Sequence, residues 1–324
     1  MTLQNIGLTS LLGAASLLAV GCASTSSSQE NVQIPAERMF CGQAAIDLDY
    51  REDSGQLILT HDGTDYTLVP SRSASGARFT GGNDADTVFW SKGNSASLTL
   101  NGTEFPECLA AGALSSPFVA RGNEPFWHVT LVGRELTLSR MGEATETLYS
   151  RMVEHGATGQ TLRAEREGLA LTLDVAPQLC MDSMSGMPYP NQVRLTVNGD
   201  TWAGCGGDPE RLLRGTEWVV EDIEGGGIID RSRVTIQFLA DNRVAGRSSC
   251  NRYMGAWNLT GEGLELGKMA GTMMACAPAL MRQEERFLKV LSEVQRFRIG
   301  PHGELILSTA DGDALRAFQS SGKP

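Results

Sequence analysis

Short strand patterns separated by turn dipeptides recur along the whole chain, and they constrain its fold more than any other feature. Asn-Gly and Asp-Gly pairs tolerate the positive φ that two-residue hairpin turns need. Such pairs lie between or next to apolar segments at residues 62–63, 101–102, 198–199 and 311–312. The sequence therefore predicts a mainly β protein built from consecutive antiparallel sheets.

One segment near the C-terminus departs from this pattern. From Pro278 to Phe297, apolar residues such as Leu280, Phe287 and Leu291 recur at steps of three to four, and charged residues fall between them. This period is that of an amphipathic helix, and a proline suits the first helical turn. We therefore expect one long helix over residues 278–297, which makes the last unit α+β.

Compositional breaks divide the chain into units. Small residues, Gly and Pro cluster at 110–117 and near 206–209, as is typical of linkers. A length of 324 residues leaves room for two or three domains. We expect a signal peptide over 1–21, a Ser-rich tether over 22–38, and three β-rich units over 39–112, 116–208 and 212–320.

The chain is acidic, with a formal net charge of −11. Such a chain repels a phosphate backbone, so we expect no nucleic-acid partner, and it attracts a cationic one. The four histidines (His61, His128, His155 and His302) have no ligand spacing. The sequence therefore supports neither an imidazole-rich metal site nor a His-based triad, and we expect no metal and no cofactor.

The N-terminus predicts export. The apolar run from Leu8 to Val20 is too short to span a bilayer comfortably and suits a signal peptide. It ends in Gly21-Cys22, and a Ser-rich segment follows, which resembles the lipobox of bacterial lipoproteins. This resemblance implies a palmitate-type lipid anchor on Cys22, and Ala23 implies an outer membrane lipoprotein that faces the periplasm. The alternative is an ordinary signal peptide with an incidental cysteine.

Six cysteines remain once Cys22 is set aside. Several pairings are possible, and sequential pairing is the simplest because each pair then falls inside one unit. It would give the disulfides Cys41–Cys108, Cys180–Cys205 and Cys250–Cys276, which an oxidising periplasm would preserve. The alternative is a set of free, buried thiols.

The first unit carries the most specific motifs. A Ser75-Gly76 loop and a Trp90-x-Lys92-Gly93 turn stand between two distant cysteines. Together they resemble the membrane-bound inhibitor of C-type lysozyme family, over roughly residues 39–110. The resemblance implies a small antiparallel β-barrel with one disulfide, whose loop enters the lysozyme cleft.

The same resemblance implies which residues bind lysozyme. Ser75 and Lys92 match the motif positions that contact the catalytic carboxylates, and we expect Arg78, in the same loop, to assist. The chain departs from the family at Phe79, where the motif has Tyr, and we expect this to remove a hydroxyl that could bond the partner. It also departs at residues 81–86, a segment about three residues longer than expected. We expect the longer segment to shift the Ser75 loop and to place further acidic residues near it.

The other two units offer less chemistry. Cys250-Asn251-x-Tyr253 and Met274-Ala275-Cys276 resemble the META domain of the HslJ heat-shock lipoprotein family, which implies a twisted antiparallel sheet packed on a helix and a link to envelope stress. The middle unit resembles an uncharacterised envelope domain. Its Met181, Met184 and Met187 could hold Cu(I), but methionines more often fill gaps in a packed loop.

Three functions follow from these features. The leading hypothesis is a non-enzymatic lipoprotein of the cell envelope that inhibits C-type lysozyme by inserting the Ser75 and Lys92 rim into the catalytic cleft. The alternative is a structural or binding module of envelope stress without lysozyme inhibition, which Phe79 and the longer segment favour. A Ser–Lys hydrolase is disfavoured, because an exposed loop offers neither a dry pocket for the lysine nor an oxyanion hole.

Overall fold

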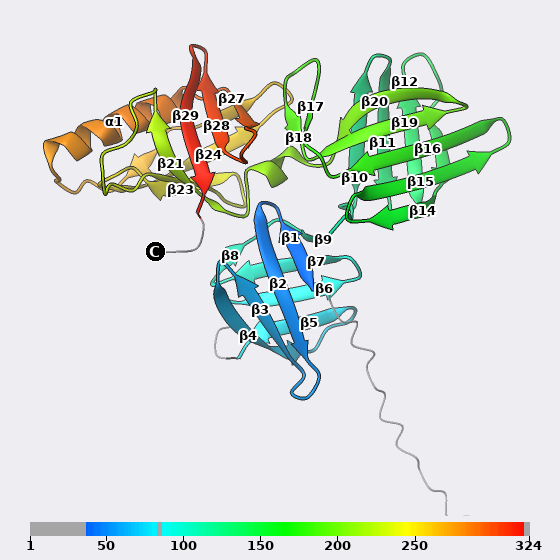
Figure 1. The fold of residues 1–324 in the computed structure, drawn as a ribbon, viewed down its shortest axis with the longest axis horizontal. Coiled ribbons are helices and arrows are strands. Elements are labelled where there is room, and N and C mark those ends of the chain that lie inside the picture. Colours follow the sequence, from blue (N-terminus) through cyan, green and yellow to red (C-terminus); the bar gives the residue numbers. More distant parts are fainter. Residues whose placement is uncertain (1–36, 83–85, 321–324) are drawn as a thin grey trace, which may run out of the picture. The chain divides into compact units, whose positions relative to one another are not determined.

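The computed structural model describes residues 37–82 and 86–320. The predicted signal peptide, the acylation site Cys22 and the tether up to residue 36 lie outside these residues. The predicted mainly β fold is confirmed: successive antiparallel sheets fill the described residues, and among them α1 is the only α-helix, near the C-terminus (Figure 1).

The first sheet closes on itself as a barrel. Its strands pair in the order β6-β5-β4-β3-β2-β1-β9-β7-β8, and a further pairing of β6 with β7 completes the ring. Alternate side chains point inward, so Ile46, Leu59 and Phe89 are fully buried. The strands are β1 Arg38–Cys41, β2 Ala44–Arg51, β3 Gln56–His61, β4 Thr64–Ser71, β5 Ala77–Gly81, β6 Val88–Lys92, β7 Ser95–Leu100, β8 Thr103–Glu104 and β9 Cys108–Ala110.

The middle sheet is a second antiparallel array, in the order β13-β12-β11-β10-β20-β19-β16-β15-β14. Its inward-facing side chains, including Trp127, Leu171 and Leu195, form its core. The strands are β10 Phe118–Asn123, β11 Phe126–Val132, β12 Glu135–Arg140, β13 Glu146–Tyr149, β14 Arg151–Gly156, β15 Gly159–Arg166, β16 Leu169–Ala176, β19 Asn191–Val197 and β20 Asp200–Gly206. Between β16 and β19 the chain makes a separate hairpin of β17 Cys180–Met181 and β18 Pro188–Tyr189.

The third sheet follows a short 3-10 helix, η1 Pro209–Leu212, and runs in the order β25-β24-β23-β22-β21-β29-β28-β27, with β26 paired to β24. Its strands and helix are β21 Glu217–Ile223, β22 Thr235–Phe238, β23 Arg243–Arg247, β24 Arg252–Leu259, β25 Leu264–Leu266, β26 Ala270–Gly271, α1 Pro278–Ser292, β27 Arg296–Ile299, β28 Leu305–Thr309 and β29 Gly312–Gln319.

The helix is shorter than the sequence predicts. It begins at Pro278 but ends at Ser292, so Val294 lies beyond it and Phe297 belongs to β27. Both side chains are nevertheless buried. The apolar period continues past the helix because the following turn and strand bury the same side of the chain.

Three hairpin turns form where the sequence predicts them. Asp62-Gly63, Asn101-Gly102 and Asn198-Gly199 each have positive φ at both residues. At the fourth predicted site only Gly312 has a positive φ, and it opens β29.

The six described cysteines are joined sequentially, as Cys41–Cys108, Cys180–Cys205 and Cys250–Cys276. The first disulfide links residues that stand directly opposite each other on β1 and β9, so it fastens the two ends of the barrel sequence. Among the described residues, no helix has the length and apolar character needed to cross a bilayer.

Candidate functional site

Ser75 lies at one rim of the barrel, in the turn of residues 72–76 that joins β4 to β5. The next residue, Gly76, has φ +69°, and a Cβ there would lie 2.1 Å from the carbonyl oxygen of Ser91. Only glycine fits so close to another backbone. The turn is therefore pressed against the end of β6, and the Ser75 side chain is exposed.

Polar contacts hold the turn in place. The hydroxyl of Ser73 donates to the carbonyl oxygens of Ser75, at 3.1 Å, and Gly76, at 2.8 Å. The indole N–H of Trp90 donates to the carbonyl of Ser75 at 2.8 Å. Two of these three bonds use the Ser75 backbone carbonyl, and no described residue bonds the Ser75 hydroxyl. The hydroxyl is thus presented on a fixed backbone and remains available to a partner.

Lys92 lies at the same rim, as the last residue of β6. The strand alternates, so Ser91 is buried while Trp90 and Lys92 point outward. Because Ala77 stands opposite Ser91, the strand that follows Ser75 starts where Lys92 ends its own strand. Within the described residues the Lys92 ammonium has no acidic partner, and its side chain is exposed. The barrel brings the predicted hydroxyl and the predicted cation together.

Arg78 is placed differently. It stands opposite Trp90 on the outer wall of the barrel, is half-buried, and donates from Nη1 to the Ser71 hydroxyl at 2.6 Å. This bond reaches across the β4–β5 pair. Arg78 therefore lies below the rim, with its guanidinium already engaged by the Ser71 hydroxyl of the neighbouring strand.

Two further rim residues were not singled out from the sequence. Arg72 is exposed in the same turn as Ser75 and adds a second cation. Trp90 is 41% exposed and touches the turn through its indole. Trp90 could have been assigned to the rim from its place in the Trp-x-Lys motif. Arg72 could not, because its position depends on where the turn begins.

The structure corrects the expected effect of both departures from the motif. Phe79 is 1% exposed and packs edge-to-face with Tyr50 inside the barrel, so a hydroxyl is missing from the core and not from the rim. The longer segment begins at Gly81 and returns at Thr87, where the Gly81 amide donates to the Thr87 carbonyl. It connects the end of β5 to the start of β6, whereas Ser75 lies just before the start of β5 and Lys92 at the end of β6. The expectation that it shifts the Ser75 loop was wrong.

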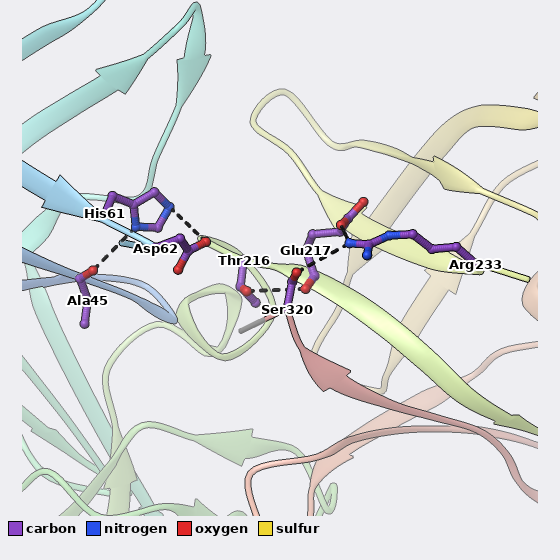
Figure 2. A network of polar contacts seen from close by, with 7 residues as sticks. All are labelled: Ala45, His61, Asp62, Thr216, Glu217, Arg233 and Ser320. Carbon is purple, nitrogen blue, oxygen red and sulfur yellow. Dashed lines mark hydrogen bonds and ion pairs between the residues drawn. The ribbon is translucent and has the colours of Figure 1, made fainter. Parts of the chain in front are cut away.

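Other polar groups of the chain hold strands together. Figure 2 shows Arg233 donating to Glu217 at 2.5 Å and to Ser320 at 3.4 Å. This contact ties the start of β21 to the end of β29. The same figure shows His61 near the Ala45 carbonyl, at 3.5 Å, on neighbouring strands of the barrel. These groups are accounted for by the sheets they join.

In the third sheet, the motif residues Asn251 and Tyr253 are structural. The Asn251 side chain donates to Glu284 at 2.9 Å and accepts from the Thr272 hydroxyl at 2.8 Å. The Tyr253 hydroxyl donates to the Thr235 carbonyl, and burial raises the pKa of that phenol. Both side chains are buried, so they join helix, loop and sheet.

The described residues contain no cluster of three or more His, Cys, Asp or Glu side chains that could hold a metal ion. Cys180 is bonded to Cys205, and the methionines near it diverge: Met187 is buried, whereas Met181 and Met184 are exposed. Of these three methionines, only Met187 packs in a hydrophobic core.

Comparison with known proteins finds family matches for two parts of the chain. Residues 41–105 match the family described as membrane-bound lysozyme-inhibitor of c-type lysozyme, and residues 211–322 match the META domain. A solved structure, described as the NMR structure of the protein from Burkholderia xenovorans, is 26% identical. The match covers 34% of this chain and 85% of that one, with a TM-score of 0.30. No curated protein matches. The first unit is thus matched to a lysozyme-inhibitor family and the third to the META domain, neither of them an enzyme family, and the middle unit is assigned to neither.

Proposed function

We propose that the first unit inhibits C-type lysozyme by placing the Ser75–Lys92 rim in the catalytic cleft, without an enzymatic activity of its own. The observation that carries the proposal is that the Ser75 hydroxyl and the Lys92 ammonium converge at one rim of a closed, disulfide-bonded barrel, with no bonding partner for either group among residues 37–82 and 86–320. The match of residues 41–105 to the inhibitor family supports the choice of target.

The chemistry of the target fits these two groups. A retaining glycosidase works with one protonated and one ionised carboxyl group about 5 Å apart. A hydroxyl can accept from the protonated carboxyl or donate to the ionised one, and an ammonium can pair with the ionised one. The outward Trp90 and Arg72 extend the same rim, and we propose that they contact the walls of the cleft.

The charge of the chain supports the encounter. The net charge of −11 attracts a cationic enzyme from a distance, while Lys92 and Arg72 meet the acidic groups inside its cleft. Long-range attraction and local pairing thus act on different parts of the target surface.

We also propose that Cys22 carries a lipid anchor and that the Ser-rich tether holds the three units on the periplasmic side of the outer membrane. The matched inhibitor family is described as membrane-bound, which agrees with an anchor at the N-terminus. A tether rich in Ser behaves as a flexible chain and would let the barrel reach an incoming enzyme.

The test is inhibition of lysozyme lysis of cell walls by the full-length protein. Ser75→Ala removes one hydrogen bond to a charged group, so we expect about tenfold weaker inhibition. Lys92→Ala removes one member of a desolvated pair, and we expect a loss of about 30-fold or more. Unchanged circular dichroism would show that both variants fold.

Matched controls lie elsewhere on the surface. Thr64→Ala removes an exposed hydroxyl at the start of β4, the end of the barrel away from Ser75, and Lys268→Ala removes an exposed ammonium outside the first unit. Both should inhibit like the parent protein. Full potency in Ser75→Ala and Lys92→Ala together would exclude the rim as the inhibitory site, and a parent protein that does not inhibit at micromolar concentration would exclude the function.

A further inference from the structure

The middle unit contains an open cleft of about 490 Å³ that neither matched family covers. Its floor is the outer face of the sheet, formed by β10, β20, β19, β16 and β15, and Glu154 of β14 stands at its end. Its wall is the segment around the β17–β18 hairpin, which includes Cys180 and Asp182. All of these elements belong to the middle unit.

The wall is fastened to the floor by several bonds. The Cys180–Cys205 disulfide anchors its start to β20. The Asn123 side chain donates to Asp182 and to the hydroxyl of Ser183, both at 3.0 Å. The cleft is therefore preformed, and a ligand would not have to order it.

The Asp182 carboxylate is hydrogen-bonded within the wall of the cleft. Besides Asn123, it accepts hydrogen bonds from the backbone N–H groups of Met184 and Ser185 and from the Ser185 hydroxyl. Partial burial opposes its charge, but these bonds outweigh burial and hold the pKa of the carboxyl below its ordinary value. Asp182 shapes the cleft and is not free to receive a ligand.

Two guanidinium groups mark one end of the cleft. Arg121 of β10 and Arg194 of β19 both line it. On β20, the strand between them, Cys205 stands opposite Arg121 and the small Ala203 stands opposite Arg194. Arg121 stacks on the Tyr189 ring at 5.6 Å. Within the described residues neither arginine is paired with a carboxylate. This end can therefore receive a carboxylate over a floor that leaves room for it.

Carboxylates mark the other end. Strand pairing sets Arg194 opposite Asp174, Asp174 opposite Thr161, and Thr161 opposite Glu154. The Thr161 hydroxyl donates to one oxygen of Asp174 at 2.7 Å, which leaves the other oxygen for a ligand. Arg121 on β10 and Asp174 on β16 are three strand spacings apart, about 14 Å. Arg194 on β19 stands beside Asp174, so the charge along the floor changes sign between β19 and β16.

We propose that this cleft binds a short peptide with free termini, its C-terminal carboxylate toward Arg121 and Arg194 and its amino terminus toward Asp174 and Glu154. An extended peptide of three residues spans about 10 Å, and the side chains of the cleft can bridge the remainder. A purely anionic ligand would meet the carboxylates, and a purely cationic one would meet the arginines. This proposal is independent of lysozyme inhibition.

The experiment is a titration of the ¹⁵N-labelled full-length protein with trialanine, followed by chemical-shift changes of residues in the cleft. Three further probes are N-acetyl-trialanine, trialanine amide and inorganic phosphate. We expect saturable shifts with trialanine and at least tenfold weaker binding when either terminus is blocked, because each block removes a charge-assisted contact.

Variants of the full-length protein test the residues. Arg194→Ala and Asp174→Asn should each weaken trialanine binding about tenfold or more. Arg163→Ala is the matched control, since Arg163 is exposed on β15 outside the cleft, and it should bind like the parent.

Each other outcome would overturn the proposal. No saturable shift at about 10 mM trialanine, or equal affinity in Arg194→Ala, would exclude the cleft as a peptide site. If only amidation of the C-terminus weakens trialanine binding, or if phosphate binds as tightly as trialanine, the cleft is a simple anion site and not a site for both termini of a peptide.

Discussion

The indole N–H of Trp90 and the carbonyl oxygen of Ser75 lie 2.8 Å apart and join two neighbouring strands of the barrel at their rim. Trp90 belongs to the strand that carries Lys92, and Ser75 to the turn before the neighbouring strand. This one bond thus sets the position of the proposed hydroxyl relative to the proposed cation.

The substitution Trp90→Phe keeps an aromatic ring at the rim but removes the N–H donor. Losing one hydrogen bond costs about 1 kcal/mol, so we expect the inhibition constant for lysozyme to rise about fivefold, while the barrel remains folded. The control is Thr64→Ala, at the start of β4 and away from the Ser75 turn, which leaves the rim untouched and should change nothing. An unchanged inhibition constant in Trp90→Phe would show that the bond does not position the turn.

Alanine substitutions at two glycines of the rim distinguish the cost of backbone strain from the cost of a steric clash. Gly76 and Gly93 both have positive φ, but a Cβ at Gly76 would meet the Ser91 carbonyl at 2.1 Å, and a Cβ at Gly93 would meet nothing within 4 Å. Gly93→Ala should destabilise the first unit by about 1–2 kcal/mol, the cost of a left-handed alanine. Gly76→Ala should cost clearly more and should also weaken inhibition. If urea unfolding shows the same loss of unfolding free energy in both variants, the turn can shift away from Ser91 at no cost.

Glu284 makes the third sheet sensitive to acid. Partial burial opposes its charge, but hydrogen bonds from Ser248 and Asn251 outweigh burial, and the pKa of the carboxyl lies below its ordinary 4.5. The unfolded chain therefore binds this proton more readily than the folded one. The stabilisation is present above about pH 4.5 and is lost as the pH falls through the lower, folded-state pKa.

We expect Glu284→Gln to lower the free energy of unfolding at pH 7 by about 2 kcal/mol and to flatten its dependence on pH below 4.5. Glu285→Gln, at the next and exposed position of the helix, is the control and should leave both unchanged. Urea unfolding at a series of pH values measures both quantities. A pH dependence as steep as that of the parent protein would contradict the assignment.

Ionic strength should affect association more than dissociation. With a net charge of −11 meeting a cationic enzyme, we expect the association rate constant to fall about tenfold or more between low salt and roughly 0.5 M salt. Lys92→Ala should instead raise the dissociation rate constant, since it removes a contact inside the cleft. Stopped-flow measurements resolve the two, and an association rate that salt leaves unchanged would exclude steering by charge.

Local signals predicted much of the fold. Asp62-Gly63, Asn101-Gly102 and Asn198-Gly199 form hairpin turns because their backbones accept positive φ, a property of the residues themselves. The end of the helix was misplaced because burial of Val294 and Phe297 continues the helical period in residues that are not helical. The period of apolar residues shows which side of a segment is buried, but the end of a helix is set by the backbone conformation.

The candidate sites divide in the same manner. Ser75 and Lys92 could be proposed from two short motifs, but the burial of Phe79 depends on strand alternation in the closed barrel. The cleft of the middle unit was not predicted at all. Arg121, Asp174 and Arg194 come from three strands, and only the register of the sheet places them along one face.

The closure of the first sheet has a thermodynamic consequence for recognition. β5 and β6, which lead away from the Ser75 turn and into Lys92, each have a paired strand on both sides. Such strands exchange their amide hydrogens only when the barrel opens. Because the rim is held by these strands, it loses little conformational entropy when a partner binds. Little of the binding free energy from its contacts is therefore spent on ordering the rim.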